Sequence, residues 1–195
     1  MSSIATRYFH RGAPGLAVGD FIVPRSELPL DGFDRHATSL ADPADVTLTY
    51  FTENLKVARG FAIKYANSPT PRARDGWLYE VRPIPVEEIA PDPDFPARAR
   101  CWTAPRCEVT AVVQQSVPGG PRAVTRALGP FTEWTDGRRA YTRDGYMTPS
   151  PELRECGVTA AHLHALGQWI SVEDVFFNRL TRQVSLVSQG AEGAY

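Results

Sequence analysis

Three side chains that could do chemistry follow one another along the chain. His10 stands in YFHRG ahead of a glycine-spaced turn, Tyr50 in TYFTEN where a strand meets a helix, and Asp92 in APDPDFP within a long connection. Taken singly, a histidine between aromatics either packs or faces a ligand, a strand tyrosine is commonly core, and an aspartate before proline commonly belongs to a turn. It is their order that has to be explained.

Sequence patterns of several familiar sites do not occur in this chain. It contains no GxGxxG, GxxxxGK[ST], HExxH or GxSxG, the patterns of dinucleotide folds, P-loops, zincins and hydrolase elbows. His162 and His164 are two residues apart, a spacing that points side chains to divergent faces of a helix, so we expect packing or solvated histidines rather than a metal pair. We therefore expect no metal site.

The elements that must position these residues are mostly strands. Seventeen prolines and fifteen glycines divide the chain into short apolar runs. Four runs rich in β-branched and aromatic residues predict strands at 20–24, 46–52, 76–83 and 107–115. A helix is predicted after Thr52 as its cap, with apolar residues at helical spacing at Leu55, Ala58, Ala62 and Tyr65. Residues 25–45 and 83–106 are long connections, which are often functional.

The residue composition of the sequence changes after residue 116. SVPGGP is typical of a linker, and two Asp-Gly pairs at 136–137 and 144–145 predict turns among hairpin-like aromatics. Residues 150–170 predict a helical stretch that begins with Ser150 as cap and Pro151 as first residue. We therefore expect two domains, one at 1–116 that carries His10, Tyr50 and Asp92, and a C-terminal extension, a hairpin plus a helix of unknown role, at 117–195.

Composition narrows the class of function. The chain has 195 residues, 43% of them hydrophobic, and 21 basic against 22 acidic residues, so electrostatic binding of nucleic acid gains no support from its charge. The N-terminus does not resemble a signal peptide, and no apolar run is long enough to span a membrane. The three cysteines lack CxxC spacing, which suits a reducing compartment. We expect a cytoplasmic protein.

Residues 7–115 resemble the rifampin ADP-ribosyltransferases, which transfer ADP-ribose from NAD+ to a hydroxyl of a rifamycin antibiotic. The family opens with an aromatic pair, H-G-T and then G-D-x-[IL]-V-P, and here Tyr8-Phe9-His10 precedes Gly19-Asp20-Phe21-Ile22-Val23-Pro24 at similar spacing. Its second block, a tyrosine before an Ala-rich helix, is similar to Tyr50-Phe51-Thr52 and the residues that follow. Its acidic loop D-D-P-N and following P-T-R resemble Pro91-Asp92-Pro93-Asp94 and Pro96-Ala97-Arg98.

The resemblance implies an α+β fold of two packed, largely antiparallel sheets with a few helices and an NAD cleft between the sheets. It implies a pentosyl-transferring glycosyltransferase whose catalytic residues are His10, Tyr50 and Asp92. Cleavage of the nicotinamide N-glycosidic bond passes through an oxocarbenium-like sugar, so Asp92 would stabilise positive charge and accept the proton of the acceptor hydroxyl. His10 would donate to a ribose hydroxyl or a phosphate oxygen, and Tyr50 would stack on nicotinamide.

The resemblance also implies the other contacts to NAD+, the only cosubstrate expected. The backbone of Arg11 and Gly12, which replace the family's Gly-Thr, would bind the carboxamide. Arginines in and after the acidic loop are candidates for the pyrophosphate, Arg98 first among them, then Arg100 and Arg106. Phe33 and Phe51 are candidate apolar walls for a large acceptor such as a rifamycin.

Two other functions remain open at this point. In one, the same chemistry is directed at a protein or nucleic acid, with Arg138 and Arg139 beside Trp134 and Tyr141 in a recognition module. In the other, the chain is a catalytically silent module that binds NAD or ADP-ribose. Neither alternative involves a membrane.

Overall fold

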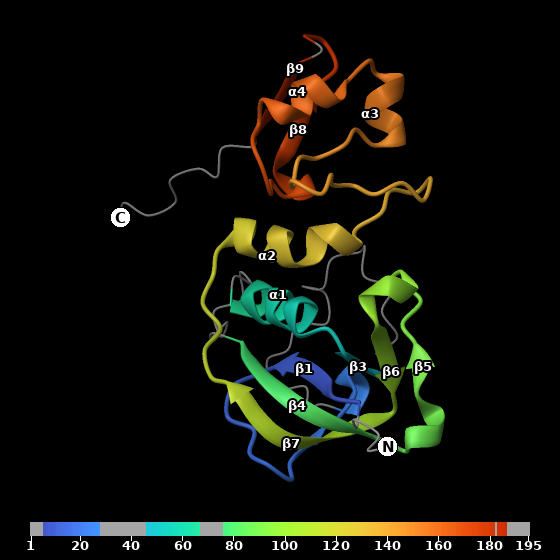
Figure 1. Ribbon diagram of the computed structural model, residues 1–195, viewed down its shortest axis with the longest axis vertical. Coiled ribbons are helices and arrows are strands. Elements are labelled where there is room, and N and C mark those ends of the chain that lie inside the picture. The colour runs from blue at the N-terminus through green and yellow to red at the C-terminus, as the bar shows by residue number, and fades with distance from the viewer. Residues whose placement is uncertain (1–5, 28–45, 67–75, 182, 187–195) are drawn as a thin grey trace, which may run out of the picture. The chain divides into compact units, whose positions relative to one another are not determined.

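The computed structural model describes residues 6–27, 46–66, 76–181 and 183–186. The chain divides into two compact units, Met1–Pro118 and Gly119–Tyr195. Both mix helices and strands, and the fold class is α+β, with a seven-stranded antiparallel sheet, a two-stranded hairpin and a few helices among the described residues. Figure 1 shows the two units in the colours of the chain.

The strands of the first unit form one antiparallel sheet in the order β2-β7-β4-β1-β3-β6-β5. Their bounds are β1 Tyr8–Gly12, β2 Phe21–Ile22, β3 Thr49–Thr52, β4 Trp77–Ile84, β5 Ala90–Pro91, β6 Cys101–Ala104 and β7 Arg106–Gln114. The four strands predicted from sequence are confirmed as β2, β3, β4 and β7, each within the predicted range or one residue beyond it.

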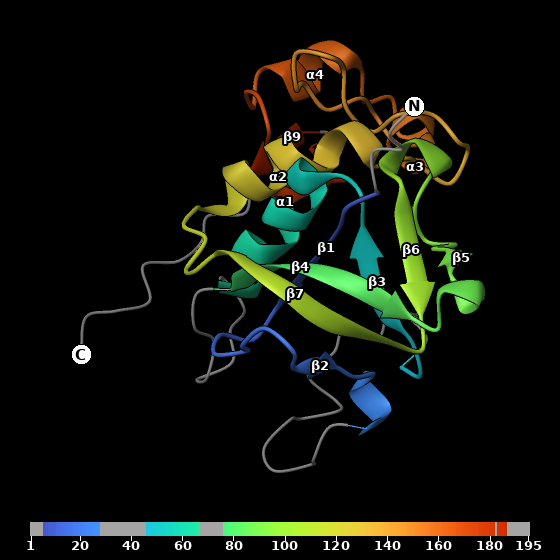
Figure 2. The same ribbon diagram turned by 60° about the horizontal axis from the view of Figure 1, so that its bottom comes forward.

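This sheet consists of two halves that meet at a single described residue pair. The first half-sheet holds β2, β7, β4 and β1, and the second half-sheet holds β3, β6 and β5. β1 pairs with β4 along its whole length, from Tyr8↔Val81 to Gly12↔Trp77. Among the described residues, β1 pairs with β3 only at Phe9↔Thr52. Figure 2 shows that β3 and β6 run in a clearly different direction from β4 and β7. The two halves therefore separate beyond Phe9.

The helix α1, Leu55–Ala66, packs on β1, β3 and β4 and covers one face of the first half-sheet (Figure 1). Ala58 and Ala62 are almost wholly buried as predicted, together with Val57, whereas Leu55 at the start of the helix is 39% exposed, so its predicted place on the buried face is wrong. Gly76 allows close packing, since a Cβ there would lie 2.5 Å from the carbonyl oxygen of Ala62. The helix cap is Asn54 rather than the predicted Thr52, because the Asn54 Oδ1 accepts the Lys56 N–H at 3.1 Å.

The other face of the sheet carries a second part of the core. Its buried residues come from both half-sheets and include Phe51, Tyr79, Val81 and Val109. Tyr79 is fully buried, and its hydroxyl donates to the carbonyl oxygen of Ala13 at 2.7 Å and accepts the Leu16 N–H at 3.3 Å. Tyr79 therefore fixes the chain that leaves β1 against this face.

The second unit has its own small core. Its elements are α2 Pro121–Leu128, α3 Pro151–Glu155, α4 Ala160–His164, β8 Val175–Asn178 and β9 Gln183–Leu186. Ala140, Tyr141, Met147, Val158 and Leu163 are buried together. The two predicted Asp-Gly turns are confirmed, with Gly137 and Gly145 both at positive φ.

The helical stretch predicted at 150–170 is two short helices instead of one. The predicted start is confirmed, because the Ser150 side chain accepts the Leu153 N–H and Pro151 occupies the first turn. Gly157 then adopts φ +83°, and the Val158 N–H bonds the carbonyl of Leu153, which ends α3. Thr159 caps the next helix, α4.

Candidate functional site

His10 lies on the central strand β1, beside a glycine. Alternation along the strand places Tyr8, His10 and Gly12 on one face, which we call the His10 face. A Cβ at Gly12 would lie 3.1 Å from the His10 Nε2 and 3.7 Å from Tyr79, so the absence of a side chain there keeps the Nε2 edge of the imidazole uncrowded.

The protonation state of His10 follows from its surroundings. Its Nδ1 lies 2.7 Å from the carbonyl oxygen of Tyr50, which can only accept a hydrogen bond. Burial lowers the pKa of His10 to about 4, and the charge of Arg11 lowers it further, against the opposing effect of the Tyr50 hydrogen bond. The ring is therefore neutral at pH 7, its one proton is on Nδ1, and Nε2 is an acceptor.

This tautomer changes the role predicted for His10. A bare Nε2 accepts a hydrogen bond from a hydroxyl and cannot donate one to a phosphate oxygen. The histidine is thus suited to bind a ribose hydroxyl as an acceptor rather than as the donor that the resemblance implies.

The side chain of Arg11 points to the face of the sheet opposite His10. Its guanidinium carbon lies 5.2 Å from the centre of the Phe61 ring on α1, and Phe61 meets Phe95 edge to face at 5.5 Å. A role of Arg11 on the His10 face is therefore restricted to its main chain, which is the role that the resemblance implies for Arg11 and Gly12.

Tyr50 is in contact with His10 through its main chain. It lies in β3 opposite Thr103 of β6, and its side chain is half-buried. The carbonyl oxygen of Tyr50 holds the imidazole, so the predicted pair comes together where the half-sheets separate. Stacking of the Tyr50 ring on a ligand remains a prediction.

Asp92 follows β5 on the outer side of the second half-sheet. Its N–H donates to the carbonyl oxygen of Cys101 at 3.1 Å, its Oδ1 accepts the Asp94 N–H at 3.0 Å, and the residue is 7% exposed. Cys101 lies opposite Thr52, which lies opposite Phe9. Asp92 thus lies on one row with Phe9, three strand spacings or about 14 Å away along the sheet. Phe9 alternates with His10, so this row belongs to the face opposite the His10 face, and the structure does not bring Asp92 into contact with His10.

The remaining predicted ligands and walls have different environments. Arg98 is exposed in a 3-10 helix at Ala97–Ala99, Arg106 is exposed at the start of β7, and Arg100 forms an ion pair with Glu53. Phe51 is 4% exposed and belongs to the core, so its predicted role as an acceptor wall is wrong. Phe33 lies outside the described residues.

Sequence reasoning missed Glu53, because a glutamate directly after the expected cap Thr52 is an ordinary residue at the start of a helix. Its side chain is 11% exposed, contacts Arg100, and accepts the Trp102 Nε1–H at 3.0 Å. Burial of Tyr8 raises the pKa of that phenol, and the negative charge of Glu53 raises it further. Only its partners Arg100 and Trp102, some fifty residues away in the sequence, distinguish Glu53 from an ordinary glutamate at the start of a helix. No local sequence pattern shows these contacts.

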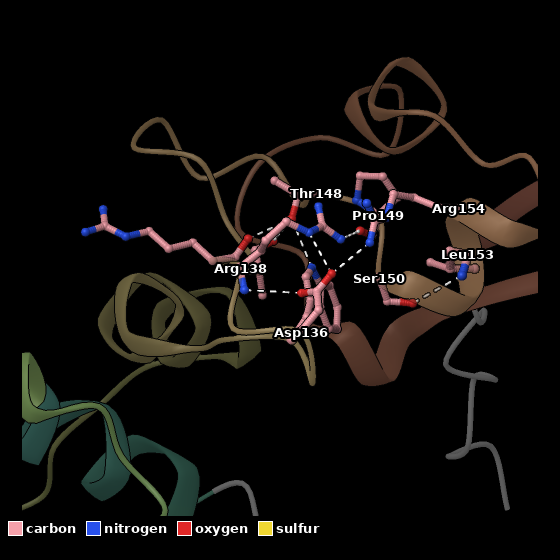
Figure 3. A network of polar contacts seen from close by, with 10 residues as sticks. Asp136, Arg138, Thr148, Pro149, Ser150, Leu153 and Arg154 are labelled. Atoms are coloured by element: carbon pink, nitrogen blue, oxygen red, sulfur yellow. Dashed lines mark hydrogen bonds and ion pairs between the residues drawn. The ribbon is translucent and has the colours of Figure 1, made fainter.

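In the second unit, Arg138, one of the two arginines predicted for recognition, is engaged internally. Arg138 donates to Asp136 at 2.8 Å and to the carbonyl oxygen of Pro149 at 3.0 Å, and Arg154 donates to Asp136 at 2.7 Å (Figure 3). These contacts join the first Asp-Gly turn to α3. The network therefore supports a structural role of Arg138 better than a nucleic-acid contact.

The two neighbouring histidines of α4 have separate structural roles. His162 Nδ1 accepts the Thr159 N–H at 3.2 Å as part of a capping box, and the His164 ring stacks on Tyr146 with centroids 4.1 Å apart. Capping and ring packing thus account for both imidazoles without a ligand.

No known family model and no curated protein matches the chain. In the part of the chain that the structure describes, no helix has the length and apolar character needed to cross a membrane.

Proposed function

We propose that the chain is an NAD+-dependent ADP-ribosyltransferase that transfers ADP-ribose to a hydroxyl of a rifamycin-like small molecule and releases nicotinamide. The observation that carries the proposal is the environment of His10. A neutral imidazole with a bare Nε2 lies beside a glycine and is held by the carbonyl of Tyr50, the second residue of the predicted set.

The arrangement of the sheet gives further support. The finer fold that we propose is the ADP-ribosyltransferase type, in which NAD+ lies between two packed sheets. The strands form one seven-stranded sheet, and the proposal takes its two half-sheets, which differ in direction and join at Phe9↔Thr52, as the equivalent of that pair (Figure 2). His10 belongs to one half-sheet, whereas Tyr50 and Asp92 belong to the other.

The reaction needs few groups from the protein. The bond between the ribose C1′ and the nicotinamide nitrogen breaks, and nicotinamide leaves as a neutral molecule with the electron pair. The acceptor hydroxyl oxygen then bonds to C1′, and its proton passes to a carboxylate, for which Asp92 is the candidate. A fixed negative charge also stabilises the developing oxocarbenium ion. His10 Nε2 accepts a hydrogen bond from a ribose hydroxyl and thereby orients the sugar.

The experiment is incubation of the purified protein with NAD+ and rifampicin, followed by mass spectrometry of the antibiotic. We expect the mass of one ADP-ribosyl unit to be added by the wild type, and by Asp94→Asn as the matched control, because Asp94 is an exposed neighbour in the same loop. We expect no addition by Asp92→Asn.

The other outcomes identify the alternatives. Release of nicotinamide without modified rifampicin would retain the transfer chemistry and replace the small-molecule acceptor by a protein or nucleic acid. Binding of NAD+ without any release of nicotinamide would show a silent binding module. Equal activity of Asp92→Asn and the wild type would remove Asp92 from the mechanism.

A further inference from the structure

A buried carboxylate links the two elements that carry Tyr50 and Asp92. We call Glu53, Arg100 and Trp102 the Glu53 cluster. The Glu53 side chain is 11% exposed, forms an ion pair with the 63% exposed Arg100, and accepts the Trp102 indole N–H at 3.0 Å. One carboxylate thus holds a residue of the loop after Asp92 and a residue of β6.

The main chain repeats the same connection. The carbonyl oxygen of Arg100 accepts the Glu53 N–H at 3.0 Å and the Thr52 hydroxyl at 2.9 Å. Arg100 is therefore joined to the end of β3 by its main chain and by its side chain.

Arg100 adopts a backbone conformation that needs such support. Its φ is +54° and its ψ +47°, in the left-handed region that costs free energy for a residue with a side chain. This conformation ends the 3-10 helix Ala97–Ala99 and turns the chain into β6, where the next residue, Cys101, bonds the Asp92 N–H. The geometry of Arg100 thus fixes the end of the loop 92–100 and, through the Cys101 carbonyl, the position of Asp92 at its start.

We propose that Glu53 is a positioning residue, which acts through Arg100 to hold the Asp92 loop in register with the strand that carries Tyr50. The ion pair sets the Arg100 turn, the turn sets Cys101, and Cys101 holds the main chain of Asp92. This inference rests on the proposed function, because it assigns the loop a catalytic purpose.

The test compares Glu53→Gln with the wild type. Glutamine retains an acceptor for the Trp102 N–H and removes the charge that pairs with Arg100. We expect kcat for nicotinamide release to fall about 10-fold to 100-fold, since small displacements of a reacting group have effects of this size, while the Kd for NAD+ changes less than about twofold. Hydrogen–deuterium exchange of residues 92–101 should become faster.

A matched control is available in the first half-sheet. Glu108 pairs with Arg82, which is as exposed as Arg100, 62% against 63%, although Glu108 itself is 24% exposed and Glu53 11%. Glu108→Gln should leave kcat and the exchange of residues 92–101 unchanged. A general loss of stability would instead lower kcat and speed up hydrogen exchange in both variants.

Changes at Arg100 test the charge itself. Arg100→Lys retains the charge and should keep kcat within about threefold of the wild type, whereas Arg100→Gln should match Glu53→Gln. The double variant should be no worse than either single one, because both remove the same interaction.

The results separate this inference from the proposed function. If the wild type releases nicotinamide and Glu53→Gln has an unchanged kcat, the positioning role is refuted and the proposed function remains. If the wild type releases no nicotinamide, the proposed function fails and the catalytic role of Glu53 with it. Unchanged exchange of residues 92–101 in Glu53→Gln would refute the inference without reference to activity.

Discussion

Replacement of His10 by glutamine should remove a defined part of the acid sensitivity of the protein. Glutamine can still donate its amide N–H to the Tyr50 carbonyl but does not titrate. The pKa of His10 is lowered from 6.5 to about 4 in the folded protein, chiefly by burial. The unfolded chain therefore binds a proton between these values that the folded chain does not.

The size of the effect follows from the two pKa values. Because the folded pKa is the lower one, the free energy of unfolding is fully retained above pH 6.5 and decreases as the pH falls toward 4. The loss attributable to His10 is about 2 kcal/mol between pH 7 and pH 5 and about 3 kcal/mol by pH 4. Every carboxylate of the protein adds its own dependence, which the variant shares.

The assay is urea unfolding of the wild type and His10→Gln between pH 4 and pH 7.5, with the difference of the two curves as the quantity of interest. A constant offset reports the general cost of the substitution, and only the slope reports His10. Imidazole NMR resonances give the pKa directly. A flat difference curve, or a His10 resonance that titrates near pH 6.5, would refute the assignment of the neutral tautomer.

Two further predictions concern close packing and cysteine reactivity. Gly145→Ala should destabilise the second unit by about 3 kcal/mol, because the new Cβ would lie 2.2 Å from the Trp169 ring and the residue has φ +87°. Gly137→Ala should cost only about 1 kcal/mol, because that residue has φ +77° but no atom within 4 Å of the new Cβ. Similar melting temperatures of the two variants would contradict this explanation. Native protein at pH 8 should react quickly with one equivalent of a disulfide reagent, at the half-buried Cys156. Burial raises the pKa of the other two thiols, to about 11 for Cys101 and about 12 for Cys107, and their rapid reaction would refute this explanation.

The sequence predicts the strands that have a regular apolar pattern and misses those that do not. β4 and β7 carry β-branched and aromatic residues over eight and nine residues, so their pattern is clear. β1 lies in the middle of the sheet but contains His10 and Arg11, which interrupt the apolar pattern. Its neighbours, rather than its own residues, make it a strand.

Local signals also misplace element ends when two residues compete for one role. Thr52 and Asn54 are both good helix caps, and Thr52 is instead the last residue of β3, with its hydroxyl on Arg100. Gly157 lies inside the helical stretch predicted at 150–170, yet a glycine in the left-handed region commonly ends a helix.

The candidate site shows the same division between local and distant information. Sequence order alone suggests His10, Tyr50 and Asp92, and the structure brings the first two into contact. The tautomer of His10 depends on the carbonyl of Tyr50, forty residues away, and the contacts of Glu53 depend on Trp102, forty-nine residues away. Such facts depend on strand register, which one sequence does not contain.

The measurement that tests the central claim most directly is the chromatographic quantification of nicotinamide released from NAD+, together with calorimetric binding of NAD+ to the same preparations. We predict that the wild type binds NAD+ and releases nicotinamide, that Asp92→Asn binds but does not release it, and that His10→Gln binds more weakly. Absence of both binding and release in the folded wild type would contradict the account.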